Sequence, residues 1–474
     1  MEKSSTTKVG PRLGQALSDG AHIVVTSAKS VRKGGVRVGA ATLVGGAAAF
    51  TSRLLGKGAG GMIGGRVAQR IDPQLLAKLS NQMTTVLVTG TNGKSTTTRM
   101  LAAALAEVGK VATNRGGDNM DSGISAALME NPDAQFAVLE VDEMHLAPVT
   151  KLVQPAAIVL LNLSRDQLDR VGEITTIEKS IRGAVAACPQ AKIIANIDDP
   201  LITSAAWDSL HPLWVAAGRG WAGDAITSPR GGQPIVYSED APTAAHPHIP
   251  SASGTDRLVQ WQELAADGEK SQFYRPRPDV SWSGTDFRVG AKITIHYEGA
   301  KVTFPVNLPG RANRGNAAQA FAAALALGAT PAAAGHGIAK VSEVAGRYAT
   351  FTWNGTTARM LLAKNPAGWQ ESLSMLDPTA DLVVAVNGQV ADGIDLSWLW
   401  DVDFAQLAGR KVWASGERGA DLVVRLAYAG VDASYTENPL SALAQTTSCA
   451  DMLLNYTSFR DCRRELIAKG ALHE

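Results

Sequence analysis

The chain has 474 residues, of which 45% are hydrophobic, and a formal net charge of +1. This length predicts two or three domains with substantial cores, and the balanced charge gives no bulk indication of a nucleic-acid or acidic partner. Its three cysteines, Cys188, Cys449 and Cys462, have neither disulfide-framework nor zinc spacing, so a reducing cytoplasm is expected.

The N-terminal segment is predicted to have two parts. Residues 1–40 mix Lys, Arg, Ser and Gly without periodicity and are expected to form a mobile leader, whereas residues 40–82 show helical spacing of apolar residues. The apolar run Val38–Phe50 has 13 residues, and a membrane-spanning helix needs about 20. We therefore expect an intracellular protein without a transmembrane segment.

Strand-like and helix-like segments alternate through most of the remaining chain. Apolar runs at 84–90, 136–142, 156–163 and 191–196 are separated by helix-length segments, which predicts a parallel sheet covered on both faces. A Pro-, Gly-, Ser- and His-rich stretch at about 218–282 predicts an irregular insertion. A hairpin pattern at 286–310 and an alanine-rich helix at 313–328 follow. A new α/β alternation from Gly346 onward predicts a second, smaller domain.

The stretch VLVTGTNGKSTTTRM (86–100) combines an apolar strand, a glycine turn with one lysine and the start of a helix. Backbone N–H groups in such a turn form an anion site. Lys94 can reach the outer phosphates of a nucleotide and the Ser95 hydroxyl can ligate Mg²⁺. The common P-loop has a glycine where this chain has Val88. We therefore predict a variant loop that binds ATP through Gly90, Thr91, Asn92, Gly93, Lys94, Ser95 and Thr96.

Acidic residues follow the next strand, in the segment LEVDE (139–143). Mg²⁺ prefers oxygen ligands, and the carboxyl ends of neighbouring parallel strands lie on the same sheet edge as the loop. Glu140 is therefore the expected Mg²⁺ ligand beside Ser95, with Asp142 and Glu143 as weaker candidates. The alternative is a solvated turn at the end of the strand.

The variant loop, LEVDE, LNLSRDQLDRVGE (161–173) and ANIDDP (195–200) occur in an order that resembles the Mur ligase superfamily. Members are ATP-dependent enzymes that activate a carboxylate as an acyl phosphate for attack by an amine. LPGRANRGNAAQA (308–320) is similar to the family's adenine-contacting segment. The resemblance implies ATP contacts from Asn196, Asp198, Asn313, Asn316 and Arg347. The alternatives are a strand-end turn for Asn196, helix capping for Asn313 and Asn316, and a surface charge for Arg347.

Two departures narrow the resemblance to the MurT branch, the ligase-like subunits of lipid II isoglutaminyl synthases. Amino-acid-adding Mur ligases usually have a histidine at the place of Gln167 and a carbamylated lysine near the place of Arg182. The strings at 363–371, 387–404 and 415–430 also resemble the MurT C-terminal domain. The implied α/β fold is a parallel-sheet Mur ligase-type ATPase domain (41–345) with the insertion, followed by a Rossmann-like C-terminal domain (346–474).

MurT proteins commonly carry a four-cysteine zinc ribbon before an RPxPD string. This chain has RPRPD at 275–279, but Ser228 and Gly231 occupy the first pair of cysteine positions and the second pair has no cysteine. Zinc needs about four N, S or O ligands, and serine and glycine supply no thiolate. His246 and His248 are expected to be solvated. We predict no zinc and an insertion held by other means or partly disordered.

The resemblance implies amidation of the α-carboxylate of D-glutamate in lipid II, with ATP and Mg²⁺ as cofactors. None of the three cysteines lies in a nucleophile elbow, so a GatD-like class I glutamine amidotransferase is the implied partner, in a one-to-one heterodimer. A lipid-linked substrate allows peripheral contact with the inner membrane face.

Four residues of the C-terminal domain are candidates for catalysis. Lys364 and Asn365 are expected to contact phosphate or substrate, and Asp392 and Asp395 to face the ammonia route or the partner's catalytic histidine. The alternative for the aspartates is capping of the following helix. Two other functions stay open: a muropeptide or folylpolyglutamate ligase that joins a free amino acid, and an ATP-binding scaffold. Gln167 and the C-terminal strings favour amidation.

Overall fold

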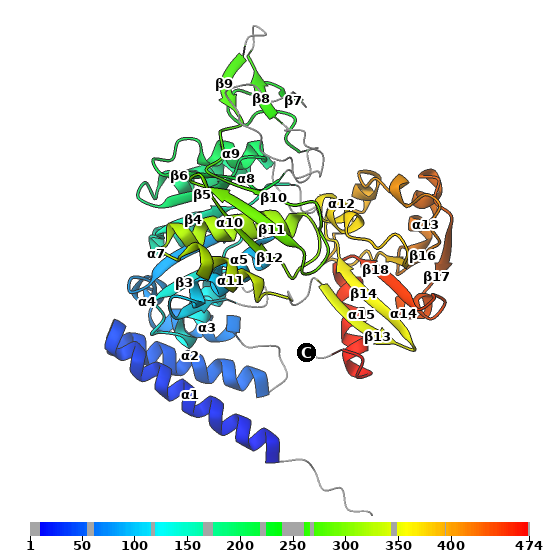
Figure 1. Ribbon diagram of the computed structural model, residues 1–474. Helices are drawn as coiled ribbons and strands as arrows, with labels where there is room; N and C mark the ends of the chain where they lie inside the picture. Colours follow the sequence, from blue (N-terminus) through cyan, green and yellow to red (C-terminus); the bar gives the residue numbers. More distant parts are fainter. Residues whose placement is uncertain are drawn as a thin grey trace, which may run out of the picture.

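The computed structural model describes residues 10–54, 61–114, 119–164, 174–218, 224–238, 260–265, 270–342, 348–393 and 395–472. Two large sheets organise these residues (Figure 1). One has nine strands and the other six, and a separate sheet of three strands lies in the insertion. The α/β class predicted from the sequence is confirmed.

The nine-stranded sheet has the order β12-β11-β10-β6-β5-β4-β1-β3-β2 and is parallel from β2 to β10. The last two strands form an antiparallel hairpin, which matches the pattern predicted at 286–310. The strands are β1 (Thr84–Thr89), β2 (Val111–Thr113), β3 (Phe136–Glu140), β4 (Ala157–Leu160), β5 (Lys192–Asn196), β6 (Pro212–Ala216), β10 (Val280–Ser283), β11 (Lys292–Tyr297) and β12 (Ala300–Pro305).

Both faces of this sheet are buried, which explains why its strands are continuous apolar runs. Along β1, Val86 and Val88 point into one apolar cluster and Leu87 into the other. Helices α5 (Lys94–Ala106), α10 (Ala312–Ala326) and α11 (Pro331–Ala339) cover the first face. The second face carries α4 (Leu75–Ser80), α6 (Asp121–Glu130), α7 (Leu146–Val153), α8 (Ile174–Ala186) and α9 (Pro200–Ala206).

Strand β1 lies between β3 and β4, so the chain fills the sheet on one side of β1 before it fills the other. The end of β1 is therefore a topological switch point, the place where parallel α/β sheets bind ligands. The glycine turn that begins at Gly90 follows β1 directly.

The N-terminal segment differs from the prediction. Residues 10–34, expected to lack regular structure, form helix α1 (Gly10–Gly34), which packs against α2 (Val36–Leu54). Gly39 makes this packing close, because a Cβ there would lie 2.1 Å from Val31. Helix α3 (Gly61–Ile71) follows and packs against α2 and α6. The prediction failed because the inward face of α1 mixes buried Thr26 and Ser30 with Ile23 and Val31, so no apolar stripe marks it.

The insertion contains β7 (Ile235–Ser238), β8 (Gln260–Leu264) and β9 (Lys270–Tyr274), which form an antiparallel sheet at the top of Figure 1. Ile235, Trp261 and Phe273 form its small core. Ser228 is buried and its Oγ accepts from the backbone N–H groups of Arg230 and Gly231. In the part of the chain that the structure describes, no cluster of three or more His, Cys, Asp or Glu residues could hold a metal. His246 and His248 lie outside the described residues.

The six-stranded sheet has the order β13-β14-β18-β15-β16-β17 and is parallel except for β13. Its strands are β13 (Tyr348–Trp353), β14 (Thr356–Leu362), β15 (Asp381–Ala385), β16 (Val412–Ser415), β17 (Ala433–Thr436) and β18 (Cys449–Leu454). Its helices are α12 (Pro366–Ser374), α13 (Gly419–Tyr428), α14 (Pro439–Leu443) and α15 (Tyr456–Ala468), with short 3-10 turns at Ser397–Trp400 and Ala405–Leu407. None of the described helices combines the length and the apolar character needed to cross a bilayer.

Candidate active site

The turn after β1 forms a cradle whose shape depends on two glycines. Gly90 and Gly93 have φ angles of 137° and 84°, which only glycine adopts readily. A Cβ on Gly93 would lie 2.7 Å from Oδ1 of Asn316 on α10, so the turn and α10 approach closely. Helix α5 begins at Lys94 and directs its N-terminal N–H groups toward the turn. Sequence and backbone together give the geometry of an anion site.

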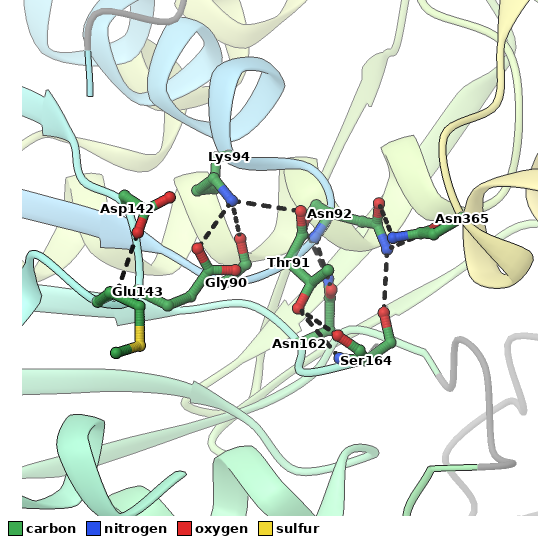
Figure 2. Close-up of polar contacts among 10 residues, drawn as sticks. Gly90, Thr91, Asn92, Lys94, Asp142, Glu143, Asn162, Ser164 and Asn365 are labelled. Atoms are coloured by element: carbon green, nitrogen blue, oxygen red, sulfur yellow. Dashed lines mark hydrogen bonds and ion pairs between the residues drawn. The ribbon is translucent and has the colours of Figure 1, made fainter. Parts of the chain in front are cut away.

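Lys94 folds back over the turn (Figure 2). Its Nζ donates to the backbone oxygens of Gly90 (2.6 Å) and Thr91 (3.3 Å) and forms an ion pair of 3.1 Å with Glu143. The side chains of Lys94 and Glu143 are only 10% and 13% exposed. An ammonium group therefore lies beside the turn with one carboxylate as its counter-ion.

The opposite side of the turn is held by amide and hydroxyl groups (Figure 2). The backbone N–H of Asn92 donates to Oδ1 of Asn162, whose Nδ2 donates back to the oxygen of Asn92, each at 2.9 Å. Oγ1 of Thr91 donates to the backbone oxygen of Ser164 and accepts from its N–H. The amides of Asn92 and Asn365 exchange two contacts of 3.5 Å. Asn365 thus connects the turn to the C-terminal domain.

The acidic residues after β3 are placed differently from one another. Glu140 pairs with Val88 in the sheet and is buried, with its backbone N–H and C=O both bonded to the Asn114 amide. Asp142 accepts the N–H of Met144 in a turn. Only Glu143 contacts Lys94 among the described acidic residues. Ser95, the other expected Mg²⁺ ligand, is half-buried in the first turn of α5.

Asn196 and Asp198 shape the neighbouring loop rather than pointing freely outward. Oδ1 of Asn196 accepts the N–H of Asp198 (3.0 Å), and its Nδ2 donates to the oxygen of Gly218 (3.3 Å). Asp198 accepts the N–H of Gly218 and forms a 2.7 Å ion pair with Arg275. Arg275 belongs to the RPRPD string, so the end of the insertion is bound to this loop.

Asn313 and Asn316 lie on the first turns of α10. Nδ2 of Asn316 donates to Oδ1 of Asn313 (3.1 Å), and Nδ2 of Asn313 donates to the oxygen of Pro309 (2.6 Å). Helix α10 has no side-chain N-cap, so the alternative in which these residues cap it is wrong. Their amides lie beside Gly93 of the turn.

A cleft of about 440 Å³ connects these groups to the C-terminal domain. Its walls include Asn92, Gly93, Thr96, Asn196, Asp198, Asn313 and Asn316 from the central domain and Lys364, Gly368 and Glu371 from the C-terminal domain. Lys364 follows β14 at the carboxyl edge of the second sheet. Asn365 caps α12 by accepting the N–H of Gly368 at 2.8 Å. Some sequence-predicted residues of each domain, such as Asn92, Asn316 and Lys364, therefore line one cleft.

Comparison with known proteins identifies relatives of the whole chain. A Mur ligase middle domain model matches residues 88–213, and a MurT ligase C-terminal domain model matches residues 362–459. A protein from Streptococcus pneumoniae, named subunit MurT of a glutamine-hydrolysing lipid II isoglutaminyl synthase, is 29% identical and covers 86% of this chain and 90% of its own. A Staphylococcus aureus protein of the same name is 28% identical over 80% and 85% of the two chains.

Over most of its length, the chain is similar to MurT proteins.

Solved structures show the same fold at low identity. The pseudomurein peptide ligase type C from Methanothermus fervidus has a TM-score of 0.61 at 18% identity and covers 84% of this chain and 81% of its own. The MurF ligase from Thermotoga maritima, solved in complex with ADP, has a TM-score of 0.54 at 13% identity over 85% of each chain. The Mur ligase fold expected from the sequence is confirmed.

The two aspartates of the MurT C-terminal domain have unlike surroundings, and neither lines the cleft. Asp392 is buried, where its carboxylate accepts the N–H of Thr457 (2.8 Å), the Thr457 hydroxyl and the N–H of Gln389. Burial raises its pKa. Asp395 is exposed, and acceptance of the Ser397 N–H lowers its pKa. Asp392, expected to face the ammonia route or the partner's histidine, is enclosed by Thr457 at the start of α15.

Three further residues named in the sequence analysis, Arg347, Gln167 and Arg182, are not found in the cleft walls that the structure describes. Arg347 and Gln167 lie outside the described residues. Arg182 forms a 2.8 Å ion pair with Glu178 within α8 and does not line the cleft.

Two acidic residues of the cleft were missed in the sequence. Asp199 caps α9 and accepts the N–H groups of Leu163, Leu201 and Ile202, yet burial raises its pKa to about 6. Glu371 on α12 accepts the N–H of Ala312 at 2.8 Å, and burial raises its pKa as well. Of the two, only Asp199 has a recognisable sequence pattern, because an aspartate followed by proline is typical of a helix start.

Proposed function

We propose that this MurT protein uses ATP to convert the α-carboxylate of D-glutamate in lipid II into an amide. The cleft carries the proposal, because it joins an anion-binding turn with Lys94 to Lys364 in the MurT-type domain. The printed names of both MurT relatives supply the substrate, lipid II, and the nitrogen source, glutamine.

The turn fits the triphosphate of ATP. Its two glycines leave room beside Asn316. The described residues give Lys94 only backbone oxygens and Glu143 as partners, and phosphate oxygens can replace these. Asn313 and Asn316, one helix turn apart on α10, are the proposed contacts to the base. In this proposal Asn196, Asp198 and Arg347 complete the nucleotide site.

Ser95 and Glu140 are the proposed Mg²⁺ ligands, because hydroxyl and carboxylate oxygens suit this ion and both residues flank the turn. When bound, Mg²⁺ supplies charge neutralisation at the β- and γ-phosphates. Glu143 holds Lys94 in place until the nucleotide enters.

The reaction has two steps. A carboxylate oxygen of the substrate attacks the γ-phosphorus of ATP, ADP leaves, and an acyl phosphate forms. Ammonia then attacks the acyl carbon, inorganic phosphate leaves, and the attacking nitrogen gives up a proton. The chain contributes charge and orientation: Lys94 and the turn amides stabilise the transferring phosphoryl group, while Lys364 faces the cleft from the substrate side.

Ammonia comes from a separate glutaminase in this proposal. A glutaminase cysteine needs a lowered pKa. Burial raises the pKa of all three thiols of this chain, that of Cys462 to about 12. A GatD-like class I glutamine amidotransferase in a one-to-one complex fits this requirement. Asp395, exposed on the MurT-type domain, is the candidate contact to the partner, and Asp392 positions its loop.

Reconstitution tests the proposal. The chain, a GatD-like glutaminase, ATP, Mg²⁺, glutamine and lipid II should give amidated lipid II, and an ammonium salt should replace glutamine and glutaminase. A free amino acid should not replace ammonia. Lys94→Ala should lower kcat/KM about 10²- to 10³-fold, because one charge aimed at the transition state is lost. Lys151→Ala, an exposed lysine of α7, is the control. Undiminished amidation by Lys94→Ala would favour the scaffold function instead.

A further inference from the structure

The helices α1 and α2 expose apolar residues where a surface helix would carry polar ones. On α1 the outward stripe has helical spacing and contains Ala21, Val24, Val25 and Ala28. Val24 and Val25 are 61% and 51% exposed. The face toward α2 is mixed: Thr26 and Ser30 are buried, Oγ of Ser27 donates to the oxygen of Gly39, and Ile23 and Val31 lie against Gly46 and Gly39. This helix therefore exposes an apolar stripe to solvent although its inward face also carries hydroxyl groups.

Helix α2 is apolar on both faces. Its inward residues Val38, Ala41 and Gly45 are buried, and a Cβ on Gly45 would lie 2.7 Å from the backbone of Gly64 in α3. Its outward stripe, again at helical spacing, contains Val36, Ala40, Leu43, Val44 and Ala47, and Val36 is 78% exposed. A helix that is apolar all round is normally covered on every side. Because α1 and α3 pack against only part of α2, none of the residues that the structure describes buries this outward stripe.

The charge of residues 20–71 indicates which kind of partner can bind the exposed stripes. Residues 20–71 contain eight Lys and Arg and no Asp or Glu, although the whole chain has a net charge of only +1. The other residues therefore carry −7, which is +1 minus +8. Arg32 and Arg37 are exposed on α1 and α2, and Arg66 and Arg70 are exposed on α3. Lys29 shares Asp133 with Lys110, and Arg37 lies near Asp72.

We propose that the outward stripes of α1 and α2 form a docking surface for an anionic phospholipid bilayer. Valine and leucine side chains would enter the headgroup boundary while the arginines and lysines bind lipid phosphates. A second copy of this chain fits less well, because two basic segments without acidic residues would face one another. Helices α1 and α2 lie at the edge of the molecule opposite the β7–β9 sheet, so docking there leaves the insertion free (Figure 1).

Vesicle binding tests this surface without any nucleotide or substrate, so its outcome is independent of the proposed function. The full-length chain should sediment with phosphatidylglycerol vesicles and not with phosphatidylcholine vesicles. Added salt should release it, because screening weakens surface attraction.

The paired variant Val24→Asp/Val44→Asp should weaken vesicle binding by about tenfold or more, since each change removes an apolar contact and adds a charge that anionic lipid repels. Val289→Asp/Val424→Asp, at valines 52% and 53% exposed elsewhere in the chain, should bind like the wild type. Circular dichroism and thermal melting should show that both pairs are folded.

Absence of binding to phosphatidylglycerol vesicles at low salt would overturn the proposal, as would equal binding by the Val24→Asp/Val44→Asp variant. Loss of a dimer in that variant, with unchanged vesicle binding, would assign the surface to a second copy. Loss of glutaminase binding alone would assign it to the partner.

Discussion

At the residue scale, the ion pair between Lys94 and Glu143 explains how the Lys94 ammonium group is neutralised and held beside the turn when no nucleotide is bound. A lysine buried without a counter-charge would be costly, and Glu143 supplies that charge at 3.1 Å. ATP has to replace this carboxylate before Lys94 can contact its phosphates. Glu143 is thus a competitor of the nucleotide in our account, whereas Glu140 is a metal ligand.

Glu143→Gln should therefore tighten ATP binding. Both side chains are only 10% and 13% exposed, and a loss of about 1 kcal/mol of competing ion-pair energy corresponds to a change in Kd of about fivefold. Calorimetric titration with ATP at fixed Mg²⁺ measures it. Glu107→Gln, which removes the exposed ion pair of Glu107 with Lys340, should leave Kd unchanged. Weaker binding by Glu143→Gln would mean that Glu143 ligates the metal.

Asp199 makes stability depend on pH. Its pKa is raised from 3.8 to about 6 in the folded chain, so folding favours the protonated form. Its contribution to stability is present below pH 4 and is lost as the pH rises through 6. At about 1.36 kcal/mol per pH unit, this loss amounts to at most about 3 kcal/mol.

Asp199→Asn should abolish that loss, because an amide does not ionise. Its oxygen can accept the N–H groups of Leu201 and Ile202, whereas the N–H of Leu163 loses its acceptor at every pH. Denaturant unfolding at pH 4.5 and pH 7 should show the wild type losing about 2 kcal/mol more than the variant, because only the part of the titration above pH 4.5 is sampled. Asp432→Asn, at an exposed aspartate, should follow the wild type. Parallel pH profiles for wild type and Asp199→Asn would refute the assignment.

Sequence reasoning found the residues of the turn because strand, glycine, lysine and helix occur in one continuous stretch. Asn162, Ser164 and Glu371 were missed since their roles arise from distant contacts: Asn162 lies 70 residues from Asn92 in the chain. The burial of Asp392 was not foreseen, because a sequence pattern does not reveal that the start of α15 packs over it.

At the element scale, the sequence predicted β1, β3, β4 and β5 and the β11–β12 hairpin, but not β2, β6 or β10. The predicted central strands have long apolar runs because helices cover both faces of the sheet. The same reasoning failed for α1, because its exposed stripe is apolar while its inward face mixes Thr26 and Ser30 with Ile23 and Val31. Such a helix lacks the pattern of apolar residues inside and polar residues outside by which a surface helix is normally predicted.

The insertion shows how a ribbon without cysteines can be held. Ser228 accepts two backbone N–H groups, and Gly231 lies directly against Glu263, whose Oε1 would be 2.2 Å from an added Cβ. Oε2 of Glu263 accepts the Ser271 hydroxyl at 2.6 Å. Hydrogen bonds and the Trp261 core thus connect the turn to the sheet in this protein.

Gly231→Ala should destabilise the insertion by about 1–3 kcal/mol, because the added methyl group overlaps Glu263. Hydrogen exchange of β7–β9 measures this. Gly183→Ala, in α8 with open space around its Cβ, should be neutral or stabilising by up to about 1 kcal/mol. A metal chelator should change neither result. Faster exchange on chelation would show that a metal holds the insertion after all.

At the scale of the whole molecule, the cleft depends on both domains being in place. The Asn92–Asn365 contacts connect them at the turn, and Ala312 of α10 donates to Glu371 of α12 nearby. The Asn92–Asn365 contacts cross between regions that match two different family models, residues 88–213 and 362–459. Sequence patterns predicted each domain, but the arrangement of the two around one cleft came only from the structure.

The central claim is that the cleft makes an acyl phosphate from ATP and a carboxylate. The most direct measurement uses lipid II labelled with ¹⁸O in the D-glutamate α-carboxylate, incubated with the chain, ATP, Mg²⁺ and ammonium salt. One labelled oxygen should move to inorganic phosphate for each amide formed, and Lys94→Ala should slow transfer and amidation together. Amide formation with unlabelled phosphate, or without consumption of ATP, would contradict the account.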